Sequence, residues 1–181
     1  MRPAAVPLAT SVAPISRVRA AASCTGASVP SSEAIAYTGR MFVIGRGVEF
    51  ATAREIALKL LETCRVAAEP LTATDLAHGP VAALDPLFPV WAIASDDGTL
   101  APVQEAAART REMGATLVAS GTAAARIDGA SYRVPVPTPS ISLLSPILSV
   151  IPGQLFAWSL ARTRGLDADA PQGLAKVTLA R

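Results

Sequence analysis

Short apolar runs alternate with longer mixed segments along most of the chain, and this alternation predicts strands that alternate with helices. The apolar runs have the length of buried strands. They are residues 41–45, 65–71, 88–94, 115–120 and 132–136. Strands separated by helices imply right-handed crossovers and a parallel sheet. We therefore expect an α/β fold, a three-layer α/β/α sandwich with a mainly parallel sheet of about five strands.

Helices are predicted between the strands, because apolar residues recur there at helical spacing. The predicted helices are residues 32–38, 52–64, 101–113 and 143–164. Gly114 and Gly165 end two of them, and Asp75 is expected to cap a further short helix across the sequence HGPVAAL. Ligands of such folds bind beyond the carboxyl ends of the strands. Two further loops, at Ser95 and Ser120, therefore share the expected functional edge with the turn after residue 44.

The two ends of the chain differ from its middle. Residues 1–37 are rich in Pro, Ser and Ala, so we interpret them as an irregular tail or the remnant of a lost upstream domain. Residues 38–181 form the expected domain. Residues 141–160 are uncharged and long enough to span a bilayer. Their Pro, Gly, Gln and Ser content favours a helix buried in a soluble core over a membrane span.

Charge and cysteine content narrow the function classes. The formal net charge is only +2, and no stripe of Lys and Arg appears, so a nucleic-acid partner is not expected. Cys24 and Cys64 lack metal or disulfide-framework spacing, which favours a reduced cytoplasmic setting without metal or cofactor. Only two of the sixteen basic residues are lysines, Lys59 and Lys176. Each is either needed as an amine, which Arg cannot replace, or retained by chance on the surface.

A charged stripe is predicted on the helix at 52–64. Glu55, Lys59 and Glu62 are spaced i, i+4, i+7, which places them within about 40° of one another on a helix. The stripe is either a solvated face or a carboxylate base held beside an ammonium group in a cleft. His78, the single histidine, precedes Gly79-Pro80. It is either a structural residue near a turn or a group that moves a proton near neutral pH.

These motifs together resemble a known family. The sequence carries GRG at 45–47, EIALKLLE at 55–62, AAE at 67–69, HGP at 78–80 and DADAPQGLAK at 167–176. In this order they resemble the second sugar-isomerase (SIS) domain of the glucosamine-6-phosphate synthase and deaminase families, over roughly residues 38–181. The endings LETC and KVT resemble the deaminase-like branch more closely.

The resemblance implies a role for several residues. The family interconverts aldose and ketose phosphates, and Glu62 matches the residue that moves the proton between C1 and C2. His78 matches the histidine that assists ring opening, usually in the site of a neighbouring subunit. Lys176 matches the tail lysine that contacts the open-chain sugar and can form an imine, with the backbone of Ala175 beside it. The other two stripe residues, Glu55 and Lys59, match those that orient the sugar hydroxyls and the base.

The phosphate site departs from the family pattern. The family places a loop of the form S-x-S-G-x-T on its first SIS domain, whereas the equivalent loop here is ASDDGT. Asp96 and Asp97 would repel a phosphate, although they suit a helix N-terminus. Arg46 either faces a phosphate or pairs locally.

We therefore expect a phosphosugar isomerase domain for substrates of the fructose 6-phosphate or glucosamine 6-phosphate type. It would act as a homodimer or with a chain that supplies the first SIS domain. The alternative is a non-catalytic module that binds sugar phosphates or a protein partner.

Overall fold

The computed structural model describes residues 35–174. Within them a five-stranded sheet has the order β2-β1-β3-β4-β5, and every pair of neighbouring strands is parallel. The strands are β1 (Arg40–Gly45), β2 (Ala67–Thr72), β3 (Val90–Ile93), β4 (Leu117–Gly121) and β5 (Tyr132–Pro135). The expected α/β sandwich is confirmed, and all five predicted strands form.

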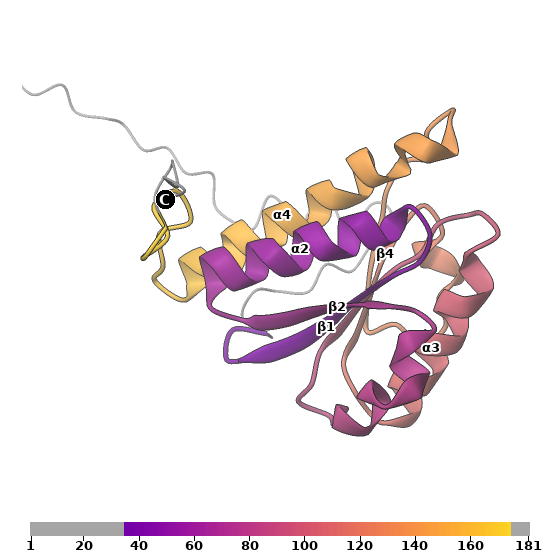
Figure 1. Ribbon diagram of the computed structural model, residues 1–181, viewed down its shortest axis with the longest axis horizontal. Coiled ribbons are helices and arrows are strands. Elements are labelled where there is room, and N and C mark those ends of the chain that lie inside the picture. The colour runs from indigo at the N-terminus through magenta and orange to yellow at the C-terminus, as the bar shows by residue number, and fades with distance from the viewer. Residues whose placement is uncertain (1–34, 175–181) are drawn as a thin grey trace, which may run out of the picture.

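Helices cover both faces of the sheet. On one face, α2 (Glu49–Cys64) and α4 (Ser145–Thr163) lie side by side (Figure 1). The other face carries α3 (Leu100–Glu112) together with two short 3-10 helices, η1 (Asp75–His78) and η2 (Pro80–Ala83). Two more 3-10 turns lie elsewhere: η3 (Ala124–Arg126) follows β4, and η4 (Ser142–Leu144) directly precedes α4.

Each face of the sheet has its own apolar core, because successive strand residues point to opposite sides. On β1, Phe42 packs into the core under α3, whereas Val43 packs into the core under α2 and α4. On β3, Trp91 contacts Phe156 of α4 edge-on, with ring centroids 5.2 Å apart. The Trp91 indole N–H donates to Ser120 Oγ at 2.7 Å, which satisfies the one polar group of this buried ring.

Close packing of α2 against α4 depends on a glycine. A Cβ at Gly153 of α4 would lie 2.3 Å from Cγ1 of Ile56, a fully buried residue of α2. The Ile56 side chain therefore occupies the space that a methyl group at position 153 would need, and this allows the two helices to pack closely.

Arg164, at the end of α4, joins the entry and the exit of the folded unit. Its guanidinium donates to the carbonyl oxygens of Ala36 at 2.8 Å and Cys64 at 2.6 Å, and also to that of Thr38. The Cys64 carbonyl lies in the last turn of α2, where carbonyls have no partner within the helix. One side chain thus donates a hydrogen bond to a carbonyl at the end of α2 and holds the segment that leads into β1.

Four local predictions were wrong in detail. Helix α2 begins at Glu49, three residues before the predicted start. The sequence HGPVAAL does not form one helix, because Gly79 has φ +129 and separates η1 from η2. Asp75 is the first residue of η1 and not its cap; its backbone N–H donates to Thr72 Oγ1. Within the described part of the predicted helix at 32–38, residues 35–37 form a turn and no helix.

Helix α4 is buried on one face only, which corrects the expectation of a core helix. The face toward α2 is buried, whereas four large apolar residues of α4 are exposed. They are Ile147, Ile151, Leu155 and Trp158, which we call the α4 stripe. The segment 142–163 is the one helix in the described range that is long and apolar enough to cross a membrane, by length and composition only.

Candidate functional site

The predicted charged stripe forms on α2, with Lys59 between two carboxylates. Lys59 Nζ lies 2.7 Å from Glu62 Oε2 and 3.7 Å from Glu55 Oε1. All three side chains are about one-third exposed. The hydrogen bond with Glu62 raises the pKa of the Lys59 amine above its ordinary value, partial burial lowers it, and the charges of both carboxylates raise it further. Lys59 is therefore an ammonium group that holds Glu62 by a charge-assisted hydrogen bond.

Glu62 opens onto a pocket between the last turn of α2 and the segment that follows α4. The pocket has a volume of about 490 Å³. It is lined by Leu61, Glu62 and Thr63 of α2, by Arg65 just after that helix, and by residues between 165 and 174 beyond α4. Arg65 Nη2 donates to Gln172 Oε1 at 2.5 Å across it. A carboxylate on a pocket wall of this size is suitably placed for proton transfer to a small ligand.

The other predicted residues divide between two places. Ala175 and Lys176 lie outside the described residues, and Leu174, which lines the pocket, is the last described residue before them. His78 is exposed at the end of η1, beyond the carboxyl end of β2. Glu62 lies in the last turn of α2, at the opposite end of the strands. The six residues of β2 lie between the two levels, about 20 Å of strand. The structure does not bring His78 to Glu62 within one chain.

Arg46 follows β1 at the carboxyl edge of the sheet. Its Nη1 donates to Thr74 Oγ1 at 2.7 Å, so it pairs locally, with a hydroxyl group and not with a carboxylate. This contact joins the turn after β1 to the turn before η1 at the end of the sheet distant from Glu62.

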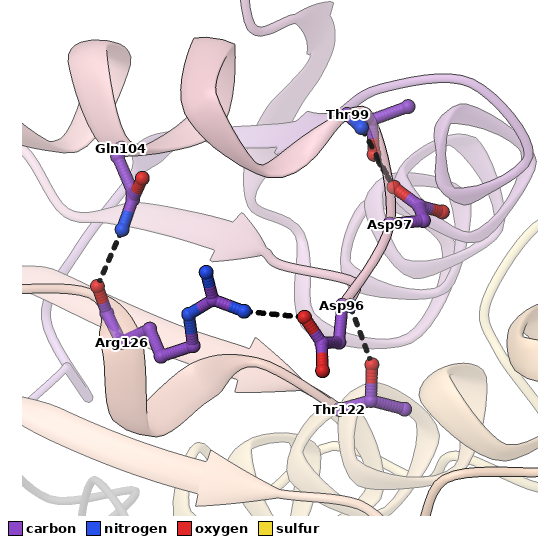
Figure 2. Close-up of polar contacts among 6 residues, drawn as sticks. All are labelled: Asp96, Asp97, Thr99, Gln104, Thr122 and Arg126. Atoms are coloured by element: carbon purple, nitrogen blue, oxygen red, sulfur yellow. Dashed lines mark hydrogen bonds and ion pairs between the residues drawn. The ribbon is translucent and has the colours of Figure 1, made fainter.

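The loop ASDDGT is occupied by contacts within the chain (Figure 2). Arg126 pairs with the Asp96 carboxylate, and the Asp96 backbone N–H donates to Thr122 Oγ1 at 2.9 Å. Asp97 Oδ1 accepts from the backbone N–H of Thr99 at 2.7 Å and from its hydroxyl at 2.5 Å. Asp97 thus stabilises the turn before α3 without capping the helix itself. The two carboxylates of this loop thus accept from Arg126 and from Thr99.

A buried carboxylate that the sequence analysis did not identify lies at the same edge. Glu49, in the first turn of α2, is 1% exposed. Its Oε1 accepts from Ser95 Oγ at 2.8 Å and Ser149 Oγ at 2.9 Å, and its Oε2 accepts from Thr52 Oγ1 at 2.7 Å. These residues, which we call the Glu49 cluster, join α2, the loop after β3 and α4.

The Glu49 cluster lies where the strand order changes direction, between β1 and β3. Open α/β sheets commonly bind ligands at such a point. Here the chain's own carboxylate and three hydroxyl groups fill it. Over residues 35–174, no group of three or more His, Cys, Asp and Glu side chains has an arrangement suited to a metal ion.

Comparison with known proteins agrees with this architecture. The profile of the SIS domain matches residues 34–164. A glutamine–fructose-6-phosphate aminotransferase (isomerizing) from a Nostoc species is 41% identical over 147 residues, which are 78% of this chain and 23% of that protein. The chain therefore spans about a quarter of the length of this relative.

Solved structures share the fold. The C-terminal domain of glucosamine-fructose-6-phosphate aminotransferase from Francisella tularensis aligns with a TM-score of 0.70 and 26% identity. The alignment covers 76% of this chain and 39% of that one. Tagatose-6-phosphate ketose/aldose isomerase from Escherichia coli aligns with a TM-score of 0.62 and 25% identity, over 74% of this chain and 39% of the other.

Proposed function

The chain belongs to the SIS domain family, and on that premise we propose that it supplies the proton-transfer half of a site for sugar phosphates. The substrate is a ketose phosphate or amino-sugar phosphate of the fructose 6-phosphate or glucosamine 6-phosphate type. The reaction moves a proton between C1 and C2 of the open-chain sugar. The observation that carries the proposal is the ion pair of Lys59 with Glu62 at 2.7 Å, on the wall of a pocket.

Glu62 is the proposed base. A positioned carboxylate can accept a proton from carbon. Lys59 holds the Glu62 carboxylate in place by a hydrogen bond at 2.7 Å and also pairs with Glu55 at 3.7 Å. In this proposal Glu55 orients the sugar hydroxyls. In this proposal Lys176 contacts the open-chain sugar, with the backbone of Ala175 beside it.

His78 acts in this proposal on the sugar ring of a neighbouring subunit's site. Its exposed position and its separation from Glu62 along β2 support that assignment, because the two residues do not meet within one chain. Arg46 binds substrate in this proposal after its hydrogen bond to Thr74 opens.

The named relatives favour one branch of the family. The curated relative at 41% identity is an isomerizing aminotransferase. The deaminase-like branch, which the tail sequence KVT favoured, is not confirmed and stays a second form of the same proposal. Both forms share the proton transfer at C1 and C2, so one experiment tests them together.

The α4 stripe supports a partner, either a second copy of the chain or a chain that supplies the first SIS domain. Its four residues, Ile147, Ile151, Leu155 and Trp158, are between 45% and 63% exposed. A contiguous apolar patch of this kind is typical of an interface.

Sedimentation of the wild type and of Ile151→Asp tests this point: the wild type should associate and the variant should not. A monomeric wild type contradicts a second copy as the partner and leaves the chain that supplies the first SIS domain. The free thiol of Cys64 is compatible with a cytoplasmic location.

The test of the function is solvent deuterium exchange. The chain is incubated in D₂O with fructose 6-phosphate or glucosamine 6-phosphate, and NMR measures exchange at C1 and C2. We expect exchange by the wild type and none by Glu62→Gln. Glu105→Gln is the matched control, because Glu105 also pairs with a basic residue on a helix, Arg109 of α3, at 2.9 Å. Exchange by Glu62→Gln at the wild-type rate contradicts the assignment of the base.

A second function, binding of sugar phosphates without catalysis, is favoured by one observation. The loop ASDDGT is saturated by the Asp96–Arg126 pair and by the contacts of Asp97, so it offers no anion site. Binding energy from a remote phosphate group commonly accelerates such reactions. Thermal stabilisation of the folded chain by either sugar phosphate, with no exchange at C1 or C2, would support this second function.

A further inference from the structure

Arg65 has a backbone conformation that is costly for its residue type. It follows the last residue of α2 with φ 54 and ψ 39, and it is the one non-glycine residue with positive φ between residues 35 and 174. Glycine is the usual residue at this position, because a Cβ is disfavoured in left-handed backbone. Strained backbone of this kind is concentrated at functional sites, so the side chain of Arg65 is a candidate for a function of its own.

The end of α2 does not require the guanidinium of Arg65. Leu60 O accepts from the backbone N–H groups of Arg65 and Val66. Cys64 O accepts from Arg164, whose guanidinium also supplies the positive charge that a helix C-terminus favours. A glycine at position 65 would make the same backbone contact, so helix capping does not explain the arginine side chain.

The side chain of Arg65 brings hydrogen-bond donors into the pocket that Glu62 opens onto. Its Nη2 donates to Gln172 Oε1 at 2.5 Å, and this is the one hydrogen bond of the guanidinium to a residue in the range 35–174. A guanidinium has five N–H donors in a planar fork that matches two oxygen atoms of a phosphate group. Because Oε1 of Gln172 is the acceptor, the NH₂ group of the same amide adds two donors nearby.

The carboxylates that line the same pocket are held by other groups. Glu62 pairs with Lys59 at 2.7 Å, and Asp167 Oδ1 accepts from the backbone N–H of Asp169 at 2.9 Å. Within the described residues no carboxylate forms an ion pair with Arg65. An anionic ligand would therefore reach the guanidinium without displacing a salt bridge, and Asp167 is the lining carboxylate whose charge opposes it.

We propose that Arg65, together with the amide of Gln172, binds the phosphoryl group of the sugar phosphate in this pocket. The pair supplies the phosphate contact that the loop ASDDGT, with its own carboxylates paired, does not offer. Glu62 and Arg65 lie three positions apart at the end of α2. One open-chain sugar can therefore place C1 and C2 at the carboxylate and its phosphorylated end at the guanidinium.

The size of the pocket agrees with such a ligand, because about 490 Å³ lies within the range of small-molecule sites. The inference rests on the proposed function for the identity of the ligand. In it Arg65 is a binding residue, which contacts the substrate at a distance from the reacting carbons.

Calorimetric titration of the full chain with fructose 6-phosphate and with fructose tests the assignment. We expect the wild type to bind the phosphorylated sugar about tenfold more tightly than fructose. Arg65→Gly removes the guanidinium and relieves the left-handed backbone, so it should fold. It should bind fructose 6-phosphate about tenfold more weakly than the wild type, the effect of losing a charge-assisted contact partly screened by solvent. Its affinity for fructose should not change.

Three further variants identify the cause of this loss. Arg65→Lys keeps the charge without the planar fork and should recover part of the affinity. Asp167→Asn should strengthen binding, because it removes the opposing charge and keeps the acceptor for Asp169. Arg54→Gln is the matched control, since it removes a positive charge from the exposed face of the same helix, outside the pocket. It should bind both sugars like the wild type.

Several results would overturn the assignment of Arg65. They are equal affinities of the wild type for fructose and fructose 6-phosphate, an affinity of Arg65→Gly for fructose 6-phosphate equal to that of the wild type, and equal losses in Arg54→Gln and Arg65→Gly. Weaker binding by Asp167→Asn would also contradict it. Competition by inorganic phosphate against fructose 6-phosphate in the wild type, absent in Arg65→Gly, would support it.

Deuterium exchange separates this assignment from the proposed function. A wild type that binds fructose 6-phosphate through Arg65 but catalyses no exchange at C1 or C2 would reject the function and leave the phosphate contact in place. Exchange by Arg65→Gly with an undiminished kcat/KM would overturn the phosphate contact while the function stands. If both hold, Arg65→Gly should lower kcat/KM about tenfold, and Glu62→Gln should lose exchange while it still binds fructose 6-phosphate.

Discussion

Replacing Glu49 by Leu tests whether the Glu49 cluster stabilises the carboxyl edge of the sheet. Leu has a similar volume, so the change leaves three buried hydroxyl groups without their shared acceptor. Thr52 and Ser149 lie in helices and can turn toward the carbonyl oxygen four residues earlier. Ser95, in the loop after β3, has no such choice. The variant therefore isolates the cost of leaving buried donors unpaired.

The magnitude follows from these donors. A buried hydroxyl left without a partner costs about 1–3 kcal/mol, and a hydroxyl that finds a poorer acceptor costs less. Summed over Ser95, Thr52 and Ser149, Glu49→Leu should cost about 3 kcal/mol of the free energy of unfolding, near 10 °C in Tm for a domain of this size. Glu49→Gln should cost about 1 kcal/mol, because its amide oxygen still accepts from Ser95 and Ser149 while its NH₂ group faces Thr52.

Denaturant unfolding of four proteins measures these values. They are the wild type, Glu49→Gln, Glu49→Leu, and Glu49→Leu combined with Ser95→Ala, Thr52→Val and Ser149→Ala. Removing the hydroxyls together with the carboxylate should recover the stability to within about 1 kcal/mol of the wild type, since an apolar replacement of a whole buried polar network is often neutral. A Glu49→Leu variant as stable as the wild type, or a combined variant no more stable than Glu49→Leu, would refute the reasoning.

Two further predictions concern α2. Gly153→Ala, at the contact of α4 with α2, should lower the free energy of unfolding by about 1–3 kcal/mol, because the new methyl group meets Ile56 at 2.3 Å. Adding Ile56→Val should restore part of this loss in urea unfolding. A Gly153→Ala variant as stable as the wild type would contradict the close packing. Lys59→Gln should destabilise the fold at neutral pH. Because the folded state raises the pKa of Lys59 above 10.5, its contribution is complete below that pH and lost as the pH rises through the raised pKa. The difference from the wild type in urea unfolding should therefore persist at about pH 8 and shrink above about pH 11, and a difference independent of pH would exclude the ion pair as its cause.

The strands and the charged stripe could be predicted because each depends on local pattern. A parallel strand covered on both faces is a continuous apolar run, and a spacing of i, i+4, i+7 places side chains on one helix face whatever the surroundings. The contact of Lys59 with Glu62 was predicted for this reason. The expectation that the loops at Ser95 and Ser120 share one edge also follows from topology, since the carboxyl ends of parallel strands meet there.

The features that sequence reasoning missed depend on tertiary contacts. The burial of Glu49 is not visible in the sequence, because its partners Ser95 and Ser149 are distant in the chain and become neighbours only when β3 and α4 pack against α2. The one local signal of this cluster was the position of Glu49 three residues before Thr52. The separation of His78 from Glu62 follows from the parallel direction of β2, and it agrees with the resemblance, in which the histidine acts in the site of a neighbouring subunit.

The clamp formed by Arg164 bears on how such a unit can be joined to others. One guanidinium contacts Ala36 and Thr38, just before the first strand, and Cys64, while it follows the last helix itself. The entry and the exit of the folded unit are therefore neighbours. A domain with adjacent ends can be inserted into a loop of another protein, or duplicated in tandem, without distortion of its sheet. Circular permutation that joins residue 35 to a residue just beyond 164 through a short linker should likewise preserve the fold, because the new connection would span a gap that Arg164 already bridges.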